Sequence, residues 1–132
     1  MSDEGLITVA SAFSVRETIE RLTAFAAAHG LNVFARIDHA DGAAKVGMQL
    51  RPTELVLFGH PRGGTPLMQD RQTAGIDLPL KALAWEDADG KVWLTCIEAT
   101  WIAERHSLGT ASAQAVAAIT VGVAAAMRAA TS

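Results

Sequence analysis

Apolar residues follow two different periods along this chain, and the alternation between those periods predicts an α+β fold. From Val15 to Ala26 they recur every three to four residues, which is the period of an amphipathic helix. Ser14 and Glu17 match a capping box at the start of this helix, and Gly30 is placed to end it. Shorter runs, alternating or wholly apolar, are typical of strands and occupy residues 6–10, 31–37, 54–58, 80–85 and 91–97.

The order of the predicted elements favours a mixed, mainly antiparallel sheet of about five strands with helices packed on one face. Within the second strand, strict alternation would place four apolar side chains on one face, namely Leu31, Val33, Ala35 and Ile37. Further helices are expected over residues 43–48, from residue 65, over 101–108, and over an Ala-rich stretch at about 111–130. We expect residues 1–132 to form a single domain.

The segment from Gly59 to Thr65 joins an apolar strand to a predicted helix and is the first candidate site. Thr65 and Pro66 suit the N-cap and the first position of that helix. Backbone amides at a helix N-terminus attract anions, and Arg and His side chains add donors. The predicted ligand-binding residues of this segment are His60, Arg62, Gly63, Gly64 and Thr65. The alternative is a tight structural turn, since neither the Walker pattern nor Gly-x-Gly-x-x-Gly occurs here.

Asp38 and His39, at the end of the second strand, form the other candidate site. An imidazole oriented by a carboxylate can act as a general base, so His39 is the candidate catalytic residue. If Lys45 and Arg51 converged with His39 and the glycine segment, the four would form a basic ligand pocket. The alternative is local: Asp38 caps a turn, His39 lies at a surface edge, and Arg51 pairs with Glu54.

Composition and charge narrow the classes of partner. The net charge is −3, with 14 acidic and 11 basic residues, and no basic stripe indicates nucleic-acid binding. The N-terminal residues lack the pattern of a secretory signal, which favours a cytoplasmic protein. The uncharged stretch from Ala111 to Met127 falls short of the roughly 20 apolar residues of a spanning helix. We therefore expect a buried helix there and no membrane partner.

Metal and nucleophile signals are weak. The four histidines lie in separate segments, so no metal site is predicted. The sequence identifies no cofactor, and haem ligation by one of the histidines stays open. Cys96 lies in the middle of the last strand on the face of Val92 and Leu94, which favours an inert buried thiol.

Several blocks of sequence, in order, resemble the domain-of-unknown-function 302 family. They are Phe34–His39, Ala43–Gly47, Leu50–Leu55, Phe58–Gly59, Gly64–Met68 and Asp77–Lys81, and the likeness covers about residues 8–108. The resemblance implies a small α+β fold similar to the TATA-binding-protein-like group, usually a dimer, and implies no known catalysis.

Three functions remain in order of preference. The first is a small soluble domain, expected to be a homodimer, that binds a small anionic ligand at the Gly-rich segment. The second is a dimeric interaction domain without a ligand, in which Ala118 and Gly122 of the Ala-rich helix form the contact. The third is an enzyme that uses His39 as acid or base, with Lys45 or Arg51 stabilising charge.

Overall fold

Residues 4–132 are described by the computed structural model, and they form one antiparallel sheet with five α-helices. The strands are β1 (Leu6–Ala10), β2 (Asn32–Asp38), β3 (Thr53–Gly59), β4 (Leu80–Glu86) and β5 (Val92–Ile97). The helices are α1 (Val15–Ala28), α2 (His39–Lys45), α3 (Pro61–Asp70), α4 (Ala99–Arg105) and α5 (Ala113–Thr131). Two 3-10 turns, η1 (Gln72–Asp77) and η2 (Thr110–Ser112), precede β4 and α5.

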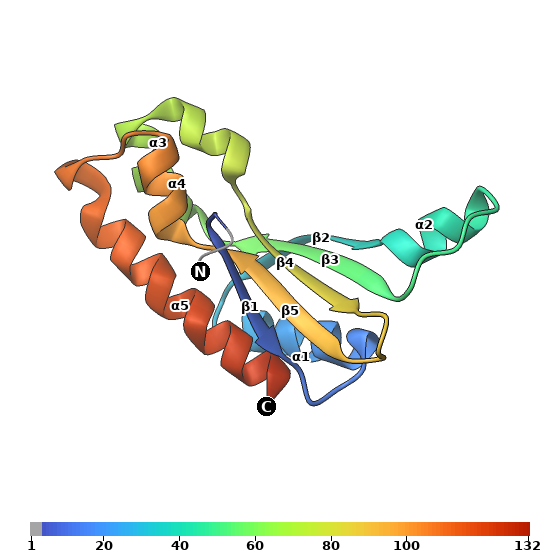
Figure 1. Cartoon of the computed structure of the whole chain (residues 1–132). Coiled ribbons are helices and arrows are strands. Elements are labelled where there is room, and N and C mark those ends of the chain that lie inside the picture. Colours follow the sequence, from blue (N-terminus) through green and yellow to red (C-terminus); the bar gives the residue numbers. More distant parts are fainter. Residues whose placement is uncertain (1–3) are drawn as a thin grey trace.

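The strand order is β1-β5-β4-β3-β2, and every neighbouring pair is antiparallel. The α+β class and the five strands are confirmed. β1 and β2 follow one another in the sequence, but they lie at opposite edges of the sheet, with α1 crossing between them (Figure 1). A helix between two strands therefore forms no parallel pair here, and the sheet is antiparallel throughout.

Helix α1 begins where the capping signal predicts. The Ser14 hydroxyl accepts a hydrogen bond from the Glu17 amide at 3.1 Å, which satisfies one of the unpaired donors of the first turn. On the apolar side of the helix, Ile19 and Leu22 are completely buried. They pack against the face of the sheet that carries Val56 and Leu94. This local agreement of cap and periodicity confirms the predicted helix.

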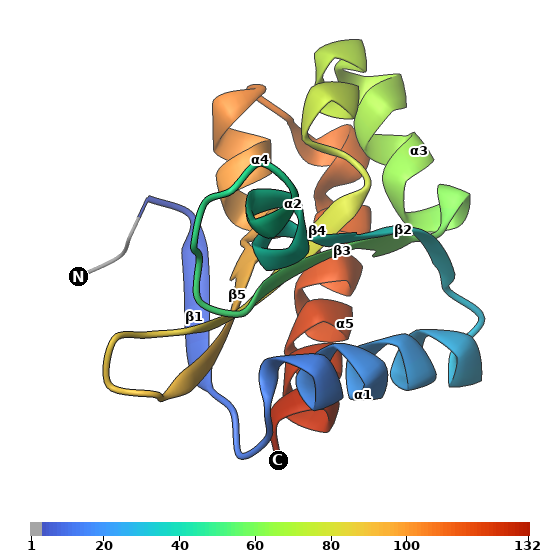
Figure 2. The ribbon, with the colours of Figure 1, turned by 90° about the vertical axis from the view of Figure 1, so that its right-hand side faces the viewer.

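Helix α5 connects two apolar clusters. Toward its C-terminus, Val123 and Met127 pack with α1 and the sheet, whereas toward its N-terminus Val116 packs with Leu67 of α3 and Ile102 of α4. Figure 2 shows α5 running behind the sheet from the level of α3 and α4 down to α1. The Ala-rich segment is therefore a core helix, and its apolar character follows from burial on one side.

The predicted alternation of β2 is broken by a β-bulge. The register with β3 shifts between Val33, which pairs with Phe58, and Ala35, which pairs with Leu57. Paired residues share a face, so Val33 lies on the helix-covered face, while Ala35 lies on the opposite one. The expectation that Leu31, Val33, Ala35 and Ile37 share one face is therefore wrong. The extra residue is Phe34, which is 54% exposed.

The second face of the sheet, which α1 and α5 do not cover, carries half-exposed side chains. Trp85 and Trp93 pair across the β4–β5 hairpin with ring centroids 6.3 Å apart. Asp87 organises the hairpin turn, because its carboxylate accepts from the Lys91 amide and from the Trp93 indole N–H, both at 2.9 Å. These contacts, led by the Trp93 hydrogen bond, hold the pKa of Asp87 below its ordinary value of 3.8.

This lowered pKa predicts an acid-sensitive hairpin. The unfolded state binds the proton more readily, so the contribution of Asp87 to stability is present above its ordinary pKa and is lost as pH falls through the folded pKa. Between about pH 5 and about pH 2, the melting temperature of the wild type should therefore fall more than that of Asp87→Asn. Tryptophan fluorescence during thermal unfolding measures both proteins, and parallel pH profiles would contradict the prediction.

Candidate functional site

The segment predicted to form a glycine loop is the first part of α3. The helix begins at Pro61, and His60 is its N-cap, with Nδ1 accepting from the Arg62 amide at 3.0 Å. Thr65 is therefore not the N-cap, and Pro66 lies inside the helix. Proline suits the first position of a helix at both 61 and 66, and sequence alone did not show that His60 would cap the earlier start.

This earlier start changes what the glycine amides can do. The amides of Gly63 and Gly64 donate to the His60 carbonyl at 2.9 and 3.2 Å, as part of the opening turn. An anion cradle needs unpaired amides that point at the ligand. These two amides already have partners inside the protein, so the predicted cradle is not formed.

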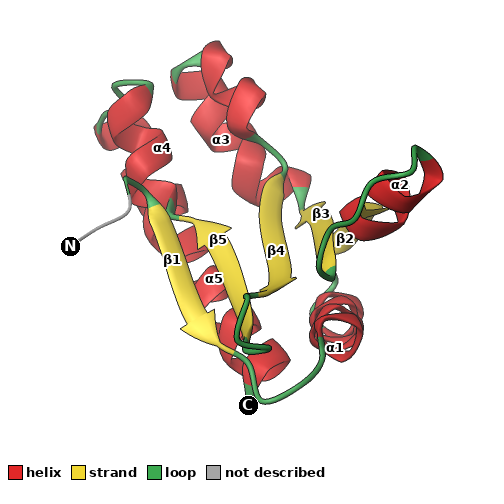
Figure 3. Ribbon diagram, turned by 45° about the vertical axis from the view of Figure 1, so that its right-hand side comes forward, coloured by secondary structure: helices red, strands yellow, loops and turns green. Residues whose placement is uncertain are grey.

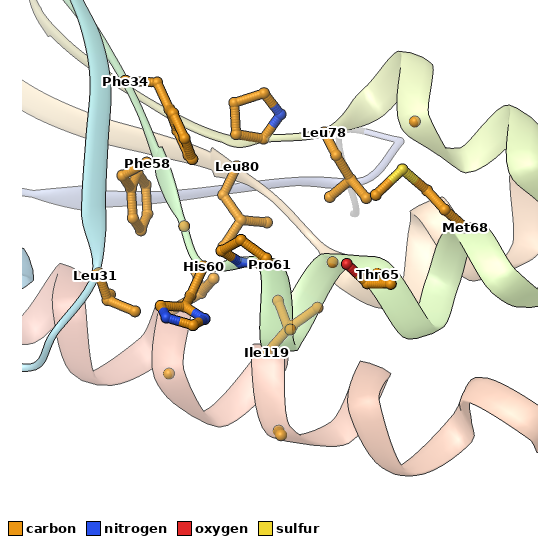
Figure 4. Close-up of a pocket in the computed structure, with 18 residues that line it drawn as sticks. Leu31, Phe34, Phe58, His60, Pro61, Thr65, Met68, Leu78, Leu80 and Ile119 are labelled. Carbon is orange, nitrogen blue, oxygen red and sulfur yellow. The ribbon is translucent and has the colours of Figure 1, made fainter.

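Four of the predicted residues nevertheless line a pocket of about 460 Å³, drawn in Figure 4. They are His60, Gly63, Gly64 and Thr65. The other walls come from β2, β3, the start of β4, η1 and α5, and they are mainly apolar. Examples labelled in the close-up are Phe34, Phe58, Leu80 and Ile119. Among the described residues that line this pocket, none is Asp, Glu, Lys or Arg.

Arg62, the cation expected at this site, does not line the pocket. It is exposed, and its amide is engaged by the His60 ring. The pocket is therefore apolar, whereas the sequence predicted a cationic site around Arg62.

His39, Lys45 and Arg51 lie elsewhere, on α2 and the loop that follows it. Figures 1 and 3 show α2 projecting from the end of the β2–β3 pair, away from α3. Lys45 pairs with Asp41 at 3.0 Å, and Arg51 Nε donates to the Glu86 carbonyl at 3.2 Å. The expected pair of Arg51 with Glu54 is therefore wrong, because Glu54 pairs with Arg16 at 2.8 Å. The structure does not bring His39, Lys45 and Arg51 to the glycine segment, so the proposed convergence into one basic pocket is wrong.

The local role considered for Asp38 is observed. Its carboxylate accepts from the Asp41 amide at 2.9 Å and caps α2, and it also pairs with Arg16 at 3.3 Å. His39 is exposed at the first position of that helix. Any catalytic or ligand role of His39 stays a prediction.

A polar cluster that the sequence did not reveal joins η1 to α4. His106 Nε2 lies 2.6 Å from Asp77 Oδ2, and its Nδ1 lies 3.0 Å from Thr73 Oγ1. Arg105 donates to the other Asp77 oxygen at 3.2 Å. An ionised carboxylate only accepts, so Nε2 is the donor and Nδ1 of the neutral ring accepts from the threonine. No local sequence signal connects residues 77 and 106.

The order hydroxyl, imidazole, carboxylate is that of a nucleophilic relay, but its surroundings do not support catalysis. The His106 side chain is only 7% exposed, and none of the cluster residues lines the apolar pocket. We interpret the cluster as a structural tie between two segments. Within residues 4–132, no three His, Cys, Asp or Glu side chains are grouped to hold a metal ion.

Cys96 is buried between the sheet and the helices, as expected. Burial raises the pKa of its thiol to about 12, so the thiol is protonated near neutral pH. The predicted burial of the Cys96 thiol is confirmed.

Comparison with known proteins identifies close relatives with a membrane function. The chain is 56% identical over 120 residues to a protein of Brucella suis biovar 1 (strain 1330) named "Fluoride-specific ion channel FluC 1". The match covers 91% of this chain and 47% of that protein. The protein of the same name from Brucella abortus biovar 1 (strain 9-941) matches with equal identity, and 44% of it is covered. The chain thus spans about half the length of the curated relatives it matches.

These names contradict the sequence-based predictions of location and function. An ion channel acts in a membrane, so the expectations of a cytoplasmic protein and of no membrane partner are overturned. The same comparison overturns the function predicted first, a soluble domain that binds a small anion. The composition of this chain did not predict a membrane function, because the chain matches less than half of each relative. Homodimer formation stays a prediction.

The fold has a counterpart among solved structures. The crystal structure of an uncharacterized conserved protein DUF302 from Bacillus stearothermophilus superposes with a TM-score of 0.83, covering 95% of this chain and 97% of that one. Identity is 19%, so this likeness concerns the fold alone. The sequence matches the family described as "Domain of unknown function DUF302" over residues 7–127, which includes most of α5. The chain belongs to the DUF302 family.

Proposed function

We propose that this chain is an accessory domain of a fluoride-channel assembly, held at the membrane by the channel part and exposed to water. The observation that carries the proposal is the identity of 56% over 120 residues with proteins named as fluoride-specific ion channels. Because the match covers less than half of each of those proteins, the ion pathway is assigned to their unmatched part. The matched part is the α+β domain described above.

The packing of α5 supports an accessory role rather than a pore. Residues Thr110–Thr131 are long and apolar enough to cross a membrane by length and composition, so the expectation that this helix is too short is corrected. Core helices of soluble domains pass the same test. Here Val123, Ala126, Met127 and Ala130 are buried against α1 and the sheet, so crossing a bilayer would remove one wall of the core.

The electrostatics also support this division of roles. The net charge of −3 provides no general attraction for an anion such as fluoride. A selective ion pathway needs polar or charged groups arranged along it. The single membrane-compatible helix among the described residues contains one charged residue, Arg128, near its C-terminal end.

The test is binding to the channel part. The half of the Brucella suis relative that this chain does not match is produced as a separate membrane protein, and the tagged chain is used to retain it in mild detergent. We expect retention in about equimolar amounts, because the proposed assembly requires direct contact between the two parts. No retention would overturn the proposal.

A flux measurement gives the matching control. Vesicles containing only this chain should show no fluoride efflux, measured with a fluoride electrode, whereas vesicles containing the channel half should show it. Efflux through the chain alone would overturn the assignment of the ion pathway to the unmatched part.

A further inference from the structure

We propose that the pocket between α3, α5 and the β2–β3 edge binds an apolar acyl chain, with the oxygen-bearing head at His60. This goes beyond the accessory role and does not depend on it. The pocket volume of about 460 Å³ lies within the range of small-molecule sites. Its walls come from separate parts of the chain that fold together around it (Figure 4).

The lining selects for a hydrocarbon. Phe34, Phe58, Leu80 and Ile119 present carbon to the cavity, and no acidic, Lys or Arg side chain of the described residues lines it. A charge placed inside would lose its hydration without gaining a partner, so a buried anion is excluded. This ligand class differs from the small anion of the overturned prediction.

The bulge in β2 contributes to this site. Phe34 is the inserted residue, and the register shift removes its side chain from the regular alternation of the sheet. Phe34 lines the pocket, and the residue is also 54% exposed. A bound chain would cover this apolar surface, which is otherwise in contact with water.

The glycine at position 122 is a second, independent observation. Glycine in a helix interior is less favourable than alanine, and Gly122 lies in the middle of α5. No heavy atom lies within 4 Å of a Cβ built at this residue, so close packing does not require glycine there. Because Gly122 has no side chain, the wall of the pocket formed by α5 is recessed at this residue. A ligand that occupies this space would explain why glycine is present.

His60 supplies the polar contact at the rim. It is exposed and lines the pocket, and its Nδ1 accepts from the Arg62 amide at 3.0 Å. In the neutral ring, Nε2 therefore carries the proton and can donate to a carboxyl or ester oxygen. The head group remains in solvent while the chain enters the cavity.

The experiment fills the pocket from α5. Binding of 11-(dansylamino)undecanoic acid is followed by its fluorescence with the wild type, Gly122→Leu and Ala124→Leu. Gly122→Leu has space for its side chain and improves helix propensity, so it should fold. We expect its affinity for the probe to fall at least about tenfold, because the leucine occupies ligand space.

Ala124→Leu is the matched control, since it adds the same side chain at an exposed position of α5 that does not line the pocket. Its affinity should equal that of the wild type. Equal binding by wild type and Gly122→Leu would overturn the proposal, as would absence of binding to the wild type.

Competition identifies the source of the chain. Decanoic acid represents a free fatty acid, and dihexanoylphosphatidylcholine below its micelle concentration represents a membrane lipid. Displacement of the probe by the first assigns a free acid, and displacement by the second assigns a phospholipid chain. If neither displaces the probe, the acyl-chain proposal is wrong.

Discussion

Ala126→Arg should destabilise the protein by at least about 3 kcal/mol, because the substitution places an unpaired charge inside the core. Ala126 is 1% exposed and lies in the apolar cluster formed by α1, the sheet and α5. Arginine is both larger and charged, so it must either displace α5 or remain unsolvated. Urea unfolding, followed by tryptophan fluorescence, measures the change in free energy of unfolding.

Ala124→Arg is the control for this experiment. Ala124 lies on the exposed side of the same helix, so its free energy of unfolding should change by no more than about 0.5 kcal/mol. The contrast distinguishes a core helix from a helix that leaves the domain to cross a bilayer. Equal effects of the two substitutions would show that α5 does not pack on α1, and the accessory-domain proposal would lose its structural support.

Asp77→Ala should cost about 2 to 3 kcal/mol, since a hydrogen-bonded carboxylate and its partners lose their contacts together. The Asp77 side chain is 11% exposed, and that of His106 is 7% exposed. Most of the loss comes from His106, whose Nε2 is left buried without its acceptor. Arg105 contributes less, because half of its side chain is in water.

Glu104→Ala tests whether removing any carboxylate from this region lowers the free energy of unfolding as much as Asp77→Ala does. Glu104 is exposed on α4 next to the cluster, so its removal should leave stability within about 0.5 kcal/mol of the wild type. Denaturant midpoints of the two variants provide the comparison. If Asp77→Ala is as stable as Glu104→Ala, the tie between η1 and α4 has no energetic role.

Local signals in the sequence determined those parts of the fold in which neighbouring residues are enough. The cap at Ser14 and the helical period after it set α1, and alternation set β5, where Leu94 and Cys96 are buried as expected. The α+β class followed from the order of such elements. In α1 and β5 the interacting groups lie within a few residues of one another, so the local sequence is enough to predict these elements.

The candidate site was determined only by the tertiary structure. The sequence named His60, Gly63, Gly64 and Thr65 as lining residues, but it predicted a cationic loop instead of an apolar pocket. Proline suits a helix start at both 61 and 66, so local chemistry did not choose between them.

Long-range contacts decided the remaining features. The bulge at Phe34 depends on the register between two strands, and the Asp77–His106 pair depends on the packing of η1 against α4. The face of α5 that is buried depends on α1 and the sheet. Such contacts join residues far apart in the chain, and local propensity has no information about them, because their free energy appears only when the separate elements pack together.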